Sequence, residues 1–91
     1  KFALSQNYPN PFNYNTNIIF DLFEGGQVTL TIFNILGQKV RTLVNMEYPA
    51  GSFGASWDGL DDLGRVVSTG IYIYKLEVPG FSSIRKMVFV K

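Results

Sequence analysis

The chain has 91 residues, 46% of them hydrophobic, and its 8 basic and 7 acidic side chains leave a net charge of +1. This length fits one small domain with a single core. The near-neutral charge argues against a nucleic-acid partner, which requires a clustered basic surface. The chain has neither cysteine nor histidine, which excludes disulfides and removes the commonest general base.

The start of the chain resembles neither a translation start nor a signal peptide. Lys1 is not an initiator methionine, and residues 1–5 lack the apolar core of a signal sequence. No apolar run approaches the roughly 20 residues that a membrane-spanning helix needs. We therefore expect a domain of a longer protein, without a membrane-spanning segment.

Residues 1–15 are rich in asparagine and proline. Pro9 and Pro11 lie two residues apart, and the residue before a proline favours extended conformations. Asparagine side chains commonly bond nearby backbone groups. The pattern predicts a rigid, extended arm that Tyr8 and Phe12 pin against the rest of the domain.

Residues 16–91 consist of short apolar stretches separated by turn-forming residues. The alternation has a period of two, most clearly in residues 27–34. There Val28, Leu30 and Ile32 alternate with Thr29, Thr31 and Phe33. No window has the period of a helix. The pattern predicts an all-β antiparallel sandwich of about seven strands, with strands at residues 16–23, 27–34, 39–44, 52–57, 65–68 (a short edge), 71–78 and 82–90.

Glycine and proline mark the expected turns. Gly25 and Gly26 predict a hairpin turn, because glycine readily takes positive φ. Residues 45–51, which include Pro49, are expected to form a longer loop. The side chains expected in the core are those on the inward-facing register: Ile18, Phe20, Leu22, Val28, Leu30, Ile32, Val40, Trp57, Tyr72 and Tyr74.

An acidic loop follows Trp57. Asp58, Asp61 and Asp62 offer oxygen ligands of the kind that calcium prefers, but the spacing is not that of an EF-hand and no glutamate closes the loop. A hydrogen-bonded turn between two strands is the favoured interpretation, and a calcium site is the alternative. Carboxylates on one short loop are also poorly placed for glycoside hydrolysis, which uses two across a cleft.

Aromatic residues have two possible roles. An exposed row of them would form a platform for sugar rings, whereas buried ones would fill the core or hold the arm. We favour the second role for most of the candidates, which are Tyr8, Phe12, Tyr14, Tyr48 and Phe53.

The last residues form an apolar, strand-like run between basic residues. Arg85 and Lys86 precede most of it, and Lys91 follows it. An ordinary closing strand with solvated charges accounts for this pattern. A terminal strand can also offer unpaired backbone groups to which a receptor adds a strand of its own. Recognition of this strand by another protein is therefore the alternative.

Several motifs, in order, resemble the type A C-terminal sorting domain of proteins exported by the type IX secretion system of Bacteroidetes-like bacteria. They are the Asn-Pro opening at residues 4–13, the turn at 34–40, Trp57-Asp58-Gly59 with Asp61 and Gly64, and the segments 70–76 and 86–91. Tyr14 departs from the family, which usually has a further proline there. The middle of the chain is also similar to the Ig-like domain of the flagellar hook-capping protein, which lacks the first and last motifs.

The resemblance implies that residues 1–91 are one Ig-like sorting domain, with residues 1–15 as the arm and 16–91 as the sandwich. Such a domain is not an enzyme and needs no cofactor. It follows a secreted cargo, is recognised by the type IX translocon after the cargo reaches the periplasm of a Gram-negative bacterium, and is removed by a sortase-like protease. The cargo is then secreted or held at the cell surface.

The resemblance also suggests which residues matter. It assigns the signal to Lys86, Met87, Val88, Phe89, Val90 and Lys91. It marks a motif without an assigned role at Asn7, Tyr8, Pro9, Asn10, Pro11 and Phe12. The alternative is a carbohydrate-binding or structural Ig-like accessory module of a secreted glycosidase.

Overall fold

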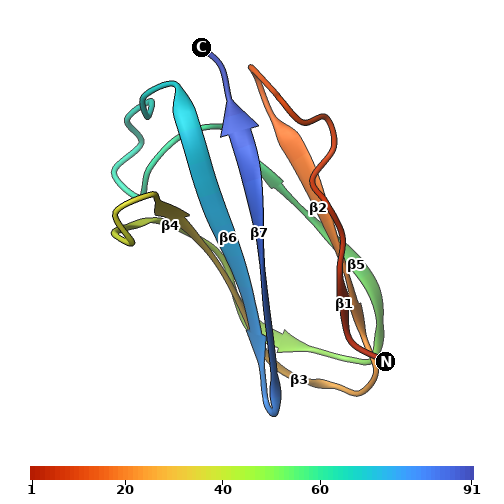
Figure 1. Cartoon of the computed structure of the whole chain (residues 1–91). Helices are drawn as coiled ribbons and strands as arrows, with labels where there is room; N and C mark the ends of the chain where they lie inside the picture. Colours follow the sequence, from red (N-terminus) through yellow and green to blue (C-terminus); the bar gives the residue numbers. More distant parts are fainter.

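A computed structural model describes residues 1–91 as seven strands in two antiparallel sheets (Figure 1). The sheets have the orders β1-β2-β5 and β4-β3-β6-β7. The predicted all-β, Ig-like sandwich of about seven strands is confirmed. No helix is long and apolar enough to cross a bilayer. The strands are β1 (Ala3–Leu4), β2 (Thr16–Leu22), β3 (Gly26–Asn34), β4 (Lys39–Tyr48), β5 (Gly51–Trp57), β6 (Gly70–Val78) and β7 (Phe81–Phe89).

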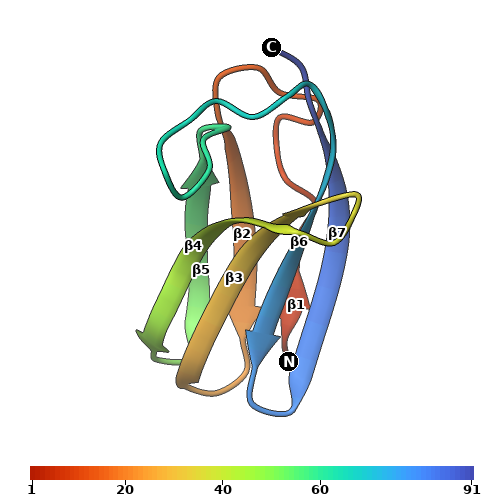
Figure 2. The same cartoon turned by 90° about the vertical axis from the view of Figure 1, so that its left-hand side faces the viewer.

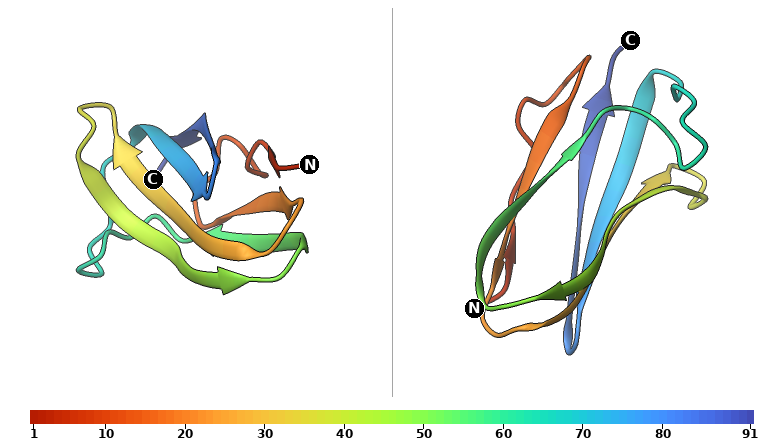
Figure 3. Two further views of the ribbon diagram at one scale, coloured as in Figure 1. Left: turned by 90° about the horizontal axis from the view of Figure 1, so that it is seen from below. Right: turned by 180° about the vertical axis from the view of Figure 1, so that it is seen from behind.

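The core lies between the two layers, which Figure 3 shows from the end and from behind. Alternation along each strand sends one set of side chains into this space. Nine of the ten predicted core residues are buried, so the prediction from the period of two is confirmed for them. Val40 is only half-buried, because β4 is bulged there and its pairing with β3 shifts register between Ile32 and Phe33.

The predicted hairpin at Gly25 and Gly26 is wrong. β2 and β3 belong to different sheets, so this connection crosses from one layer to the other. Neither glycine has a positive φ. A Cβ atom at Gly25 would lie 3.0 Å from the carbonyl oxygen of Tyr48, so close approach of two backbones, and not backbone conformation, requires glycine at this position.

Two further connections differ from the prediction. The expected loop at residues 45–51 is mostly strand, because β4 continues to Tyr48 and only Pro49 and Ala50 separate it from β5. The expected edge strand at residues 65–68 is wrong. That segment lies in the β5–β6 loop and has one isolated bridge, between Leu60 and Val66.

The β5–β6 loop covers the first part of the free edge of β4. The amide of Asp62 donates to the carbonyl oxygen of Val40 at 2.9 Å, and the carboxylate of Asp62 accepts from the amide of Thr42 at 3.1 Å. These bonds satisfy groups that an uncovered edge strand would offer to another chain.

Candidate functional site: the N-terminal arm and the terminal strand

The arm connects the two sheets along one side of the sandwich. It starts in β1, which pairs with β2, and the backbone of Tyr8 exchanges two 2.9 Å hydrogen bonds with Asn17. It then bends across to the other sheet, where Phe12 pairs in parallel with Phe89 of β7. The expectation of an arm extended throughout residues 1–15 is therefore wrong, since the chain bends between these contacts. Figure 1 shows the arm beside β7.

The arm occupies the outer edge of β7 near its end. The side chain of Gln6 donates to the carbonyl oxygen of Lys86 at 2.7 Å. The amide of Phe12 donates to the carbonyl oxygen of Val88 at 3.1 Å, and its own carbonyl oxygen accepts from the amide of Val90 at 2.9 Å. The amide of Val88 donates to the Asn10 side chain at 2.9 Å. The expected free edge for strand addition is therefore absent over residues 86–90.

Only one of the two predicted pins holds the arm through its side chain. Phe12 is 3% exposed, and its ring centroid lies 5.7 Å from that of Trp57 and 5.1 Å from that of Phe89. The pinning role of Phe12 is confirmed. The side chain of Tyr8 is 79% exposed, so this residue is held by its backbone and not by its ring.

Asn7 anchors the base of the arm from a buried position. Its amide donates to Oη of Tyr74 at 2.8 Å, and that hydroxyl donates to the carbonyl oxygen of Ser5 at 2.7 Å. The Asn7 side chain donates to Oγ1 of Thr16 at 3.0 Å. The Tyr74 hydroxyl is protonated and can donate at neutral pH, and burial raises its pKa further.

Two of these contacts could not be assigned from the sequence. Asn10 was expected to bond its own segment, but its side chain bonds β7. Thr16 belongs to neither of the two predicted motifs. The available signal was its position, because Thr16 is a polar residue on the same inward register as Ile18 and Phe20.

An aromatic cluster joins most of the motifs that resemble the sorting family. Trp57 lies 5.4 Å from Tyr72 and 6.2 Å from Phe89, measured between ring centroids, and Phe12 contacts it from the arm. Gly59 has φ 76°, and a Cβ atom there would lie 2.9 Å from the Phe89 ring. Glycine is therefore needed at this position both for backbone conformation and for space.

The terminal segment divides into buried and exposed residues. Met87 and Phe89 are buried and belong to the core. Lys86, Val90 and Lys91 are exposed, and the amide of Lys91 donates to Oγ1 of Thr69 at 3.0 Å. The buried residues hold β7 in place, and only the others are available to a partner.

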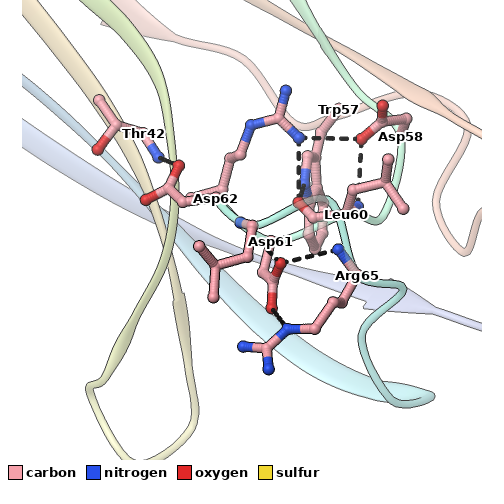
Figure 4. A network of polar contacts seen from close by, with 9 residues as sticks. Thr42, Trp57, Asp58, Leu60, Asp61, Asp62 and Arg65 are labelled. Carbon is pink, nitrogen blue, oxygen red and sulfur yellow. Dashed lines mark hydrogen bonds and ion pairs between the residues drawn. The ribbon is translucent and has the colours of Figure 1, made fainter.

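The acidic loop is a network of hydrogen bonds within the protein (Figure 4). Asp58 accepts from Arg41 at 3.2 Å and from the amide of Leu60 at 3.1 Å. Asp61 accepts from the amides of Leu63 and Arg65, both at 2.9 Å. Asp62 accepts from β4, so each of the three carboxylates accepts hydrogen bonds from different donors. No group of three acidic side chains lies close enough together to hold a metal ion. This geometry supports the hydrogen-bonded turn.

The turn at Asp61 predicts a pH dependence of stability. Its pKa is lowered, mainly because the amide of Arg65 donates to the carboxylate, with smaller effects of Leu63 and the Arg65 guanidinium. A folded-state pKa below the unfolded value means that ionised Asp61 stabilises the fold above about pH 4 and loses this effect as pH falls. Wild type should exceed Asp61→Asn in unfolding free energy at pH 7, and the difference should shrink towards pH 3. A difference independent of pH in urea titrations would contradict this.

The aromatic candidates do not form one platform. Phe12 is in the core, while Tyr48 and Phe53 are half-buried and pack against each other with ring centroids 4.8 Å apart. Tyr8 and Tyr14 are exposed. Any sugar-binding role would therefore depend on two residues of the arm and not on a row of five.

These features define an Ig-like β-sandwich domain whose arm and last strand close one side together. Residues 23–80, more than half of the chain, match the FlgD Ig-like domain family. The chain therefore belongs to this family. The arm, β2 and β7 all lie outside the matched residues.

Solved structures with similar folds come from larger proteins. Latent PorU from Porphyromonas gingivalis superposes with a TM-score of 0.74 at 17% identity, over 99% of this chain and 9% of that one. PorZ, a surface component of the type IX secretion system of the same bacterium, superposes with a TM-score of 0.60 at 18% identity, over 99% of this chain and 11% of that one. FlgD from P. aeruginosa superposes with a TM-score of 0.60 at 19% identity, over 84% of this chain and 66% of that one. The chain spans only about a tenth of PorU and of PorZ, and such identities show a shared fold. No curated protein sequence matches the chain.

Proposed function

We propose that this domain is a sorting signal that directs a secreted cargo protein through the type IX outer-membrane translocon. The observation that carries the proposal is the union of the arm with β7. These two segments lie outside the FlgD-like part, resemble sorting domains in sequence, and are bonded to each other as one surface. The similarity to PorZ, itself a component of that secretion system, adds support.

The proposal has consequences for location and partners. The domain would follow its cargo through the periplasm of a Gram-negative bacterium to the cell surface or the medium. Its partners would be the translocon and a sortase-like protease that removes it. The domain acts by being recognised, so the proposal gives it no catalytic group and no cofactor.

Recognition would read side chains on a folded domain. With the arm in place, the backbone edge at Lys86 and Val88 is occupied, so strand addition there requires that the arm first leave. Lys86 and Lys91 are exposed, and neither forms an ion pair within the domain. Their charges are free to meet carboxylates of a receptor.

Replacing Lys86 and Lys91 together by glutamine tests this reading. A reporter followed by the domain should be exported by a host with the type IX system, and export should fall in the double variant. Both side chains are exposed, so the unfolding free energy should change by no more than about 0.5 kcal/mol. Lys1→Gln is the matched control, because it removes one exposed charge outside the proposed signal.

The outcomes separate the mechanism from the function. Undiminished export of the double variant would reject recognition of the Lys86 and Lys91 charges. Failure of the unaltered domain to export any reporter would reject the sorting function. Truncation of residues 86–91 is a poor test, because it also removes the core residues Met87 and Phe89.

A further inference from the structure

The outer faces of the two sheets differ in chemistry. In the β1-β2-β5 sheet, alternation directs mainly polar side chains outward: Asn17, Asp21, Ser52 and Ser56, with Ile19 as the apolar exception. This is the usual pattern for a sheet with one solvated face. The β4-β3-β6-β7 sheet, which Figure 2 shows from outside, does not follow it.

Five apolar side chains point outward from the second sheet, on the register opposite to the buried residues of β3, β6 and β7. We call them the outer apolar face: Phe33, Ile71, Ile73, Ile84 and Val88. Phe33 is the cross-strand partner of Ile73, and Ile71 is the partner of Val88. Ile71 is 49% exposed and Ile84 is 62% exposed, and Phe33, Ile73 and Val88 are half-buried, so the group as a whole lies partly in solvent.

Lysines are interleaved with this face. Lys39 is the cross-strand partner of Phe33, and Lys86 is the partner of Ile73. Neither forms an ion pair, whereas Lys75, opposite Ile84, lies 3.5 Å from Glu77. The face is therefore both apolar and positively charged.

A hollow of about 270 Å³ lies at the β7 side of this face. Its walls come from Gln6, Ile73, Ile84, Arg85 and Lys86. The hollow brings together an aliphatic surface, a residue of the arm and the first lysine of the proposed signal. Its size suits one or two side chains of a partner and not a whole ligand.

We infer that the outer apolar face is a docking surface for a partner protein whose own surface combines aliphatic side chains with carboxylates. The inference rests on the proposed sorting function. It identifies the face of the domain on which a partner would contact Lys86. Contiguous exposed apolar groups mark interaction sites, and the unpaired lysines select an acidic partner.

Two other occupants fit the face less well. A second copy of the chain would bring Lys39 and Lys86 towards the same residues of its partner, and like charges repel. A bilayer surface would need side chains that reach into it, but Phe33, Ile73 and Val88 are half-buried in the sheet. Proteins that lie at bilayer interfaces typically insert a broader apolar surface.

The Ile71→Thr and Ile84→Thr double variant tests the inference. Threonine keeps the branched shape that suits a strand but removes apolar contact. We expect reporter export to fall about tenfold, the factor for 1.4 kcal/mol of lost contact at two sites. Ile19→Thr, on the outer face of the other sheet, should leave export unchanged. Melting temperatures of all variants show whether each is folded.

A charge variant tests the acidic character of the partner. Lys39→Glu lies outside residues 86–91, yet it should also reduce export severalfold because it places a carboxylate on the docking face. Lys1→Glu is its matched control and should have no effect. Equal export of the Lys39 and Lys1 variants would overturn the acidic partner.

The remaining outcomes are decisive. Normal export of the folded double isoleucine variant would overturn the docking face and leave the sorting function intact. No export of the unaltered domain would reject both. Self-association of the purified domain in sedimentation, lost in the double variant, would assign the face to a second copy. Binding to phosphatidylglycerol vesicles, lost in the same variant, would assign it to a bilayer. Either result overturns the inference.

Discussion

Replacing Trp57 by alanine should lower the free energy of unfolding by about 3–5 kcal/mol. The ring is fully buried and packs against Phe12, Tyr72 and Phe89, so truncation leaves a cavity between the two sheets. It also removes the 2.8 Å hydrogen bond from Nε1 to the carbonyl oxygen of Leu60. Urea titrations followed by circular dichroism measure the loss.

An exposed apolar residue in the β5–β6 loop, which also contains Leu60, provides the control. Leu63 is 76% exposed, so Leu63→Ala should change the free energy of unfolding by no more than about 0.5 kcal/mol. If Trp57→Ala unfolded at the wild-type urea concentration, the ring would not be packed as the structure shows. Similar losses in both variants would mean that the loop, and not the core, depends on these side chains.

The strands and their inward faces could be predicted because burial follows a local rule. A period of two identifies which side chains of a half-buried strand point inward, and this succeeded for the residues of β2, β3 and β6. Val40 is the exception. A bulge changes which way a side chain points, and the local sequence pattern of β4 does not predict one.

The connections were less predictable because local residues do not specify which sheet comes next. Gly25 and Gly26 suit a hairpin turn and a crossing between layers equally well. Residues 45–48 are polar enough to resemble a loop, and an edge strand tolerates polar side chains because part of it faces solvent. Only the partner strand, distant in sequence, separates these possibilities.

The site was predictable in outline and not in its contacts. The sequence singled out both ends of the chain, but it gave no reason to connect them. The bonds from Gln6 and Asn10 to β7 span about eighty residues of sequence. They depend on which edge of the sandwich lies beside the arm, which is a property of the assembled fold.

Replacing Phe12 by alanine should destabilise the domain by about 3–5 kcal/mol and release the arm from β7. The ring is the arm's contact with the aromatic cluster, and the backbone of Phe12 bonds Val88 and Val90. Amide exchange at Val88 and Val90 should therefore accelerate more than at Leu30, whose position in a central strand reports global opening. Hydrogen exchange followed by NMR measures each site separately.

Tyr8→Ala is the matched control, because Tyr8 lies on the same arm but has an exposed side chain. Its backbone bonds to Asn17 remain, so we expect a change of no more than about 0.5 kcal/mol and unchanged exchange at Val88. Equal acceleration at Val88 and Leu30 in Phe12→Ala would mean that the arm leaves only when the whole domain opens, and that the ring is not a separate pin.

The Phe12→Ala variant also separates two ways in which a translocon could read the terminal strand. Recognition of the surface formed by arm and strand together requires the arm to be bound, so export should fall as the arm is released. Recognition by strand addition requires the edge at Lys86 and Val88 to be free, so export should hold or rise. Because the arm occupies this edge, we expect the fall. A rise at a temperature where the variant is still folded would show that the arm protects the edge of β7 until the translocon displaces it.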